Sequence, residues 1–190
     1  MENSVSYKAG DLDEFTVILS CPGKDEEQSN PQMPAMGKTG DNLEQLLTLL
    51  TPNLQGMSLT RGNITTANSW DKVEYEVKTG RSEATAVEVL DAQNLDRLYL
   101  EIKDTKSVIL ACGDNAKIAI LALRYAKDFE PNVKFAFIQH LGNRGLNSTI
   151  NRDVNGTKLI STNSAKIKKK NRIARLTVVM HDILTQLSES

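Results

Sequence analysis

Short apolar runs alternate with amphipathic stretches along this chain, and the alternation predicts an α/β fold. Runs typical of buried strands lie at residues 15–20, 58–66, 107–112 and 133–139. Apolar positions at helical spacing follow them in stretches that begin at Thr39, Ser82 and Asn115, and a last helix is expected over 165–188. Strands that alternate with helices favour a parallel sheet covered on both faces. We therefore expect one domain over residues 1–190, a three-layer α/β/α sandwich with a central four-stranded parallel sheet.

Polar and glycine-rich segments follow three of the predicted strands. They lie at residues 21–23, 68–70 and 140–144, whereas residues 71–81 are charged and irregular. In parallel sheets, ligands bind beyond the carboxyl ends of the strands. The three segments are therefore predicted to meet at one candidate binding site.

The composition is that of an ordinary globular protein, with 39% apolar and 25% charged residues. Lys and Arg number 23 against 24 Asp and Glu, for a net charge of −1. This balance excludes a uniformly basic nucleic-acid coat protein but allows a local basic patch. We find no apolar run long enough for a transmembrane helix and no secretory signal in the polar, acidic first residues. Cys21 and Cys112 are too few for a disulfide framework, so we expect a cytoplasmic protein with reduced thiols.

The tripeptide Gly37-Lys38-Thr39 opens a predicted helix and looks like the end of a phosphate-binding P-loop. The full pattern needs a glycine five positions earlier, where Gln32 stands, and a loop that follows its strand directly. Here the whole segment 21–36 intervenes. A simple helix start is the preferred interpretation, and P-loop-like nucleotide binding stays as an alternative.

A longer pattern begins at Ser20-Cys21-Pro22-Gly23, continues with Glu26, and leads through Gly37 and Gly40 into a leucine-rich helix. It resembles the first motif of the uracil-DNA glycosylase superfamily, in particular its four-cysteine bacterial and archaeal class. Segments 64–68, 108–116 and 137–142 resemble later motifs of that superfamily in the same order. The resemblance covers roughly residues 15–150 and implies a DNA-binding enzyme that cleaves an N-glycosidic bond.

The resemblance also implies roles for individual residues. His140 matches the residue that donates to the leaving base, and such a donor lowers the barrier because negative charge grows on the base. Asn68 matches a base-reading amide, and Glu26 fits an acidic position, although Asp25 and Glu27 are alternatives for positioning the attacking water. The expected base pocket consists of Cys21, Pro22, Gly23, Ala35 and Met36. His181, within the last helix, is interpreted as a packing or surface residue.

Departures from the family pattern point to a different substrate. The four cluster cysteines are absent, so we expect no iron–sulfur cluster, no metal and no other cofactor. Ser20 stands where a carboxylate or amide is usual, Ala35 where an aromatic stacks on uracil, and Gly23 where a tyrosine blocks substituents on C5. Two small residues predict an open pocket. A superfamily branch active in phage defence removes glucosylated hydroxymethylcytosine, and such a bulky base is our leading expectation, ahead of uracil.

Two groups of residues are candidate DNA contacts. Arg144, Leu146 and Asn147 follow His140, where a side chain can wedge into the gap that a flipped base leaves. Cations cluster on the first turns of the last helix, where the helix dipole disfavours them; they are Lys166, Lys168, Lys169, Lys170, Arg172 and Arg175. Such a cluster suits phosphate contacts, and a solvated helix face is the alternative.

Together these patterns predict a monomeric, monofunctional DNA glycosylase that removes a modified pyrimidine and leaves an abasic site. Uracil excision in base-excision repair is the first alternative. A non-catalytic DNA-binding homologue is the second, and the missing carboxylate at Ser20 favours it. A bifunctional lyase that uses Lys24 is a lesser variant.

Overall fold

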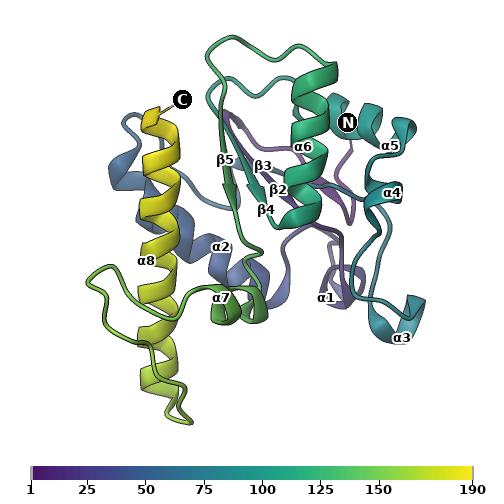
Figure 1. Cartoon of the computed structure of the whole chain (residues 1–190). Helices are drawn as coiled ribbons and strands as arrows, with labels where there is room; N and C mark the ends of the chain where they lie inside the picture. The colour runs from purple at the N-terminus through teal and green to yellow at the C-terminus, as the bar shows by residue number, and fades with distance from the viewer. Residues whose placement is uncertain (1, 190) are drawn as a thin grey trace.

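The computed structural model describes residues 2–189 and contains a five-stranded sheet in the order β1-β3-β2-β4-β5 (Figure 1). The strands are β1 Tyr7–Lys8, β2 Leu12–Leu19, β3 Ile64–Asn68, β4 Val108–Cys112 and β5 Lys134–Ile138. β2 to β5 run parallel, and β1 pairs antiparallel with β3. The predicted α/β class is confirmed, but the count of four strands was wrong. β1 has only two residues, too few for any periodicity to show.

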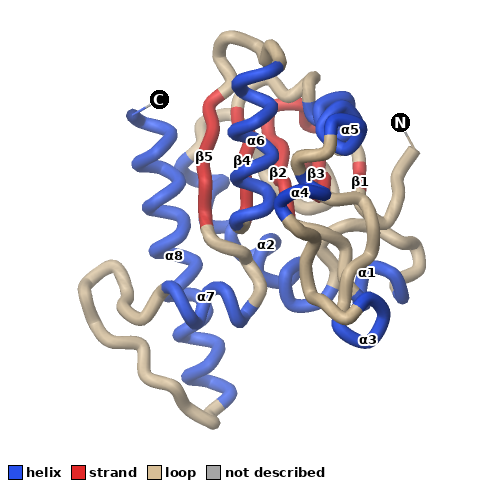
Figure 2. The backbone as a smooth tube through the Cα atoms, turned by 45° about the vertical axis from the view of Figure 1, so that its right-hand side comes forward, coloured by secondary structure: helices blue, strands red, loops and turns tan. Residues whose placement is uncertain are grey.

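Helices cover both faces of this sheet (Figure 2). They are α1 Lys24–Gln28, α2 Gly37–Leu50, α3 Glu76–Thr79, α4 Ala86–Val89, α5 Ala92–Ile102, α6 Asp114–Ala126, α7 Asn143–Thr149 and α8 Ala165–Glu189, with a 3₁₀ turn at Thr51–Asn53. α2 and α8 pack on one face, and α5 and α6 on the other. The arrangement is compatible with the expected three layers.

Strand β2 shows why the central strands are apolar throughout. Phe15, Val17 and Leu19 join the hydrophobic cluster beneath α2 and α8, whereas Ile18 joins the cluster beneath α5 and α6. Successive side chains of a strand point to opposite faces, and both faces are covered here. The continuous apolar run is what burial on both faces requires.

Two predicted boundaries were wrong. The helix expected from Ser82 is two helices, because Asp91 begins α5 as its N-cap and accepts hydrogen bonds from the backbone N–H groups of Gln93 (3.0 Å) and Asn94 (3.2 Å). An aspartate in this position starts a new helix rather than continuing an old one. The strand expected over 58–66 spans Ile64–Asn68 instead, so Asn68 ends the strand rather than following it.

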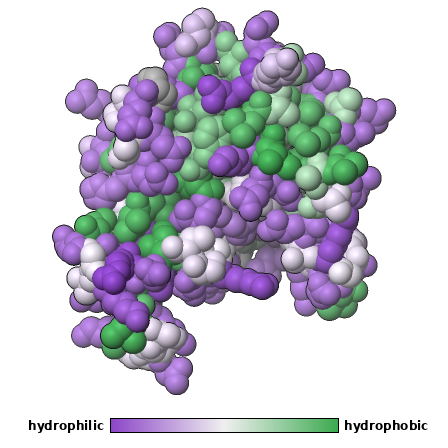
Figure 3. All heavy atoms as spheres, in the orientation of Figure 1, coloured by the Kyte–Doolittle hydropathy of each residue, from purple (hydrophilic) through white to green (hydrophobic). Residues whose placement is uncertain are grey.

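The long helix α8 has two unlike halves. Its buried residues, Leu176, Val179, Met180, Ile183 and Leu187, all lie in the half that packs against α2 and β5. The other half extends beyond the sheet beside the loop 151–164 (Figure 1), and its surface in this view is mostly hydrophilic (Figure 3). Among residues 2–189, no helix combines the length and apolar character needed to cross a membrane.

Candidate functional site

A cavity of about 560 Å³ lies at the carboxyl ends of the parallel strands. We call it the His140 cavity. Six of the predicted site residues line it, namely Cys21, Gly23, Glu26, Asn68, His140 and Arg144. They are joined by Leu19, Thr39, Glu74, Ser82, Glu83, Gly142, Asn143, Gly145 and Ser148. The segments after β2, β3 and β5 therefore meet in one place, as expected from strands that run parallel.

His140 is held in a defined hydrogen-bonding state. The backbone N–H of Gly142 donates to its Nδ1 at 2.9 Å, so the neutral ring carries its proton on Nε2. Burial lowers the pKa of His140, although the nearby carboxylates Glu83 and Glu26 act in the opposite direction. A neutral imidazole with an Nε2–H donor is therefore the state expected at neutral pH.

Three glycines enclose this histidine. A Cβ atom on Gly145 would lie 2.4 Å from the His140 carbonyl oxygen, and one on Gly142 would lie 2.9 Å from its Nδ1. Gly113, at a φ of +98°, would place a Cβ 3.4 Å from the His140 Cβ. The absence of side chains lets Gly113 and Gly142 approach the imidazole ring and lets Gly145 approach the His140 backbone.

Asn42 ties the segment after His140 to helix α2. Its side chain is fully buried, and its Nδ2 donates to the Leu141 carbonyl (2.7 Å) and to Asn143 Oδ1 (3.2 Å). The sequence analysis did not single it out. A signal was present, because Asn42 is a polar residue adjoining the apolar stripe of a predicted helix, and buried amides need partners.

Asn68 forms part of the floor of the cavity. It ends β3 and is only 1% exposed. Its side-chain Nδ2 donates to the Ser6 carbonyl at 3.4 Å, and its backbone carbonyl accepts from Arg97 Nη2 at 3.0 Å. These contacts fix the backbone that carries the amide.

Glu26 links the turn after β2 to the residue that precedes α2. Its Oε2 accepts from the Gly23 N–H (2.9 Å), and its Oε1 accepts from the Met36 N–H (2.8 Å). The carboxylate thus orders the loop between β2 and α2, and its role in positioning water stays a prediction. The alternative Glu27 pairs with Lys78 and accepts from the Tyr75 hydroxyl at 2.8 Å.

Of the five expected base-pocket residues, Cys21 and Gly23 line the cavity, and the other three do not. Ala35 is 2% exposed and packs in the core. Pro22 is buried, and its carbonyl accepts from the Glu74 N–H at 2.9 Å. Met36 is half-buried, and its backbone N–H donates to Glu26 Oε1. Burial raises the pKa of Cys21 to about 12, so its thiol is neutral and not a nucleophile near pH 7.

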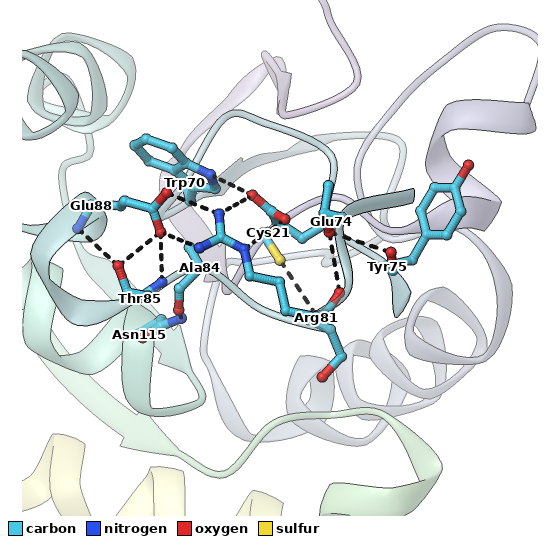
Figure 4. A network of polar contacts seen from close by, with 11 residues as sticks. Cys21, Trp70, Glu74, Tyr75, Arg81, Ala84, Thr85, Glu88 and Asn115 are labelled. Carbon is cyan, nitrogen blue, oxygen red and sulfur yellow. Dashed lines mark hydrogen bonds and ion pairs between the residues drawn. The ribbon is translucent and has the colours of Figure 1, made fainter. Parts of the chain in front are cut away.

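The segment after β3 contributes Glu74, Ser82 and Glu83 to the lining of the cavity. An ion-pair network holds this segment in place (Figure 4). The Arg81 guanidinium donates to Glu74 at 2.5 and 2.9 Å and to Glu88 at 2.7 and 2.9 Å. These contacts with Arg81 lower the pKa of Glu74 and of Glu88 to about 2. Trp70 Nε1 also donates to Glu74 at 3.3 Å. Sequence reasoning missed this network because Glu74, Arg81 and Glu88, although seven residues apart, do not lie on one helix, so their spacing did not indicate contact.

A second cavity of about 630 Å³ lies beside the first. We call it the cationic cavity, because five cations line it, namely Lys38, Lys168, Lys169, Arg172 and Arg175. None of the described residues that line it is acidic, and Asn143 lines both cavities. Arg175 Nε donates to the Ile150 carbonyl at 2.9 Å, and the buried Arg172 Nε has no partner among the described residues.

The predicted DNA contacts are divided between the two cavities. Arg144 is exposed and lines the His140 cavity, whereas Asn147 is exposed and lines the cationic cavity. Leu146 also borders the cationic cavity but is 2% exposed and belongs to the core, so it does not project as a wedge. Lys166 and Lys170 are exposed on α8 outside the cavity lining.

The Gly37-Lys38-Thr39 turn begins α2 between the two cavities, with Lys38 lining one and Thr39 the other. Lys38 Nζ pairs with Asp41 at 3.1 Å. Helix α1 separates this turn from β2, unlike a P-loop, which follows its strand directly. Lys24 is exposed and lies outside the lining of the His140 cavity.

Comparisons with known proteins add no family to this geometry. No protein-family model matches the sequence, and no match is found among curated proteins. Within the described residues 2–189, no group of three or more His, Cys, Asp or Glu side chains is placed to hold a metal ion.

Proposed function

We propose that this chain is a monofunctional DNA glycosylase that removes a bulky C5-substituted cytosine, such as glucosylated hydroxymethylcytosine in phage DNA. The observation that carries the proposal is the His140 cavity itself. It combines a neutral imidazole donor and a deeply placed amide from two different strand ends. A cationic cavity adjoins it. An enzyme that excises a flipped base can use these groups to hydrogen-bond the base and to hold the DNA strand.

The chemistry is a displacement at the sugar. In the proposed complex, Asn68 contacts the edge of the flipped base, and His140 Nε2–H donates to a base carbonyl oxygen. As the bond between C1′ and the base nitrogen breaks, its electron pair leaves with the base, and the donor stabilises the growing negative charge. The sugar gains oxocarbenium character. A water oxygen bonds to C1′ and loses a proton, the departing base anion takes up a proton in turn, and an abasic site and the free base are left. No metal or organic cofactor takes part in these steps.

The cationic cavity accounts for DNA affinity in this proposal. Phosphates that contact its lysines and arginines release condensed counterions, which supplies binding free energy that does not depend on sequence. The shared residue Asn143 places this surface directly beside the mouth of the His140 cavity. A strand bound along the cationic side therefore has a base within reach of His140. We expect a monomer that acts on DNA in the cytoplasm.

The His140 cavity has room for a base larger than uracil. Its volume of about 560 Å³ lies within the range of about 300–1,000 Å³ typical of small-molecule pockets. Gly23 contributes no side chain to its wall, and Ala35 lies in the core, so neither residue narrows it. Uracil excision in repair is the second candidate.

The proposal is tested with three DNA duplexes that carry cytosine, uracil or glucosylated hydroxymethylcytosine at one position. The purified protein is incubated with each, and alkali then cuts the abasic sites. We expect the glucosylated substrate to be cleaved much faster than uracil, and cytosine not to be cleaved. Cleavage of uracil alone would identify a repair enzyme. DNA binding without cleavage would favour a non-catalytic homologue, which the engagement of both Glu26 oxygens with backbone N–H groups also favours.

A further inference from the structure

We propose that Glu83 is the residue that selects a glycosylated base, by accepting hydrogen bonds from hydroxyl groups of the sugar substituent. The inference rests on the proposed function and names the group that reads its substrate.

Three carboxylates line the His140 cavity, and they differ in their hydrogen-bond partners. Glu26 accepts backbone N–H groups on both oxygens, and Glu74 accepts from Arg81 and Trp70. Glu83 is exposed and forms no hydrogen bond or ion pair with any of the described residues. It is therefore the carboxylate of this cavity that is free to bind a substrate.

The backbone on either side of Glu83 is nevertheless fixed. Cys21 Sγ lies 3.9 Å from the Ser82 carbonyl as a weak donor, and Asn115 Nδ2 donates to the Ala84 carbonyl at 2.9 Å (Figure 4). The charge of Glu83 also acts to raise the pKa of both Cys21 and His140, as expected for a carboxylate near both side chains. The backbone contacts on both sides keep Glu83 beside the cavity, and its carboxylate has no partner among the described residues, which leaves it available to a ligand.

The charges around the cavity indicate which kind of ligand group can lie next to Glu83. Arg144 and the adjoining cationic cavity attract the DNA phosphates. Glu83 repels phosphates, so it suits a group that has no negative charge and donates hydrogen bonds, and the hydroxyl groups of a sugar on the base are such groups. A carboxylate has two acceptor oxygens, which suit two neighbouring hydroxyl groups of a sugar. Such charge-assisted hydrogen bonds are among the stronger ones in proteins.

The depth of the residues agrees with this assignment. Asn68 is almost fully buried, His140 is half-buried, and Glu83 is exposed. In the proposed complex, the base contacts the buried Asn68 and its bulky substituent extends toward solvent, where the exposed Glu83 can accept its hydrogen bonds. The exposure of Glu83 also argues against a role in positioning the attacking water, because a group with that role is better placed where solvent is excluded.

The test compares Glu83→Ala and Glu83→Gln with the unaltered protein on three bases: glucosylated hydroxymethylcytosine, hydroxymethylcytosine and uracil. We expect kcat/KM to fall by about 10- to 100-fold on the glucosylated base, mainly through KM, because the charge-assisted hydrogen bonds no longer form. Activity on bases without the sugar should change little. Glu76→Gln, an exposed carboxylate outside the cavity, is the matched control and should behave like the unaltered protein.

An equal loss on all three bases would overturn the proposal and make Glu83 part of the reaction itself. No change on any base would also overturn it. If the unaltered protein cleaves none of them, the proposed function fails first, and binding of the same oligonucleotides then decides the inference. A preference for the glucosylated strand that Glu83→Gln removes would support it, and the absence of such a preference would overturn it.

Discussion

The two neighbouring cavities are built in opposite ways. The His140 cavity lies on strand ends, and most of its wall is tied by specific contacts, including those of Glu26, Asn42 and Arg81. The cationic cavity lies between α7, the loop 151–164 and the half of α8 that extends beyond the core. Most of its cations are exposed. The His140 cavity suits a reaction in which the positions of the side chains matter. The cationic cavity suits the attraction of a negatively charged ligand.

Because the two cavities differ in this way, changes in one should affect the excision rate and changes in the other should affect DNA affinity. A buried, oriented donor acts on the rate, because its hydrogen bond strengthens in the transition state. Exposed cations act on affinity, and salt screens their effect. Changes in the His140 cavity should therefore move kcat, and changes in the cationic cavity should move the salt dependence of DNA binding.

The largest effect is expected from His140→Ala. Loss of one donor to the leaving base should lower the excision rate by about 10²- to 10³-fold, and Asn68→Ala should also lower it. Single-turnover excision on the modified duplex measures both. His181→Ala, an exposed histidine of α8, is the control and should retain full activity. If His140→Ala and Asn68→Ala both keep full activity, the assigned roles are wrong.

The second effect concerns the packing around His140. Gly145→Ala places a Cβ 2.4 Å from the His140 carbonyl oxygen, so the backbone must shift. We expect a loss of about 1–3 kcal/mol in the free energy of unfolding, together with slower excision. Urea unfolding measures the first quantity. In Gly62→Ala the nearest atom would be at 3.5 Å, an ordinary contact, and this variant should be close to neutral. Equal stability of the two variants would argue against tight packing at His140.

The third effect concerns the cationic cavity. The double variant Lys168→Ala, Lys169→Ala should weaken binding to cytosine-containing and modified DNA alike. The slope of log K against log salt should become shallower by about 0.9 for each phosphate that the variant no longer neutralises. Titrations at several salt concentrations measure it. Lys103→Ala, an exposed lysine just after α5 that lines neither cavity, is the control. An unchanged slope would show that α8 is a solvated face and not a phosphate site.

The smallest effect is on the pH dependence of stability. Burial lowers the pKa of His140 in the folded state, so between this lowered pKa and the ordinary value near 6.5 the unfolded chain binds more protons. The free energy of unfolding should therefore fall as the pH decreases below about 6.5. His140→Asn should reduce this fall when unfolding is measured at pH 7.5 and 5.5. The same fall in both proteins would mean that His140 makes no contribution.

The predictions from sequence succeeded where the signal was local. The apolar runs and helical spacing located β2, β4, β5, α2, α6 and α8, because burial on one or both faces imposes a regular pattern. The gathering of Cys21, Asn68 and His140 followed from strand order, since parallel strands end at the same edge.

Only the tertiary structure decided the contacts between distant segments. It placed Ala35 and Leu146 in the core rather than in a pocket or at the surface. It also joined Asn42 to Leu141 across ninety-nine positions. The amino-acid sequence determined which segments are apolar, and thus the strands, the helices and the edge where polar residues meet. Which side chains contact one another across that edge depends on how the helices pack on the sheet, and no local pattern encodes it.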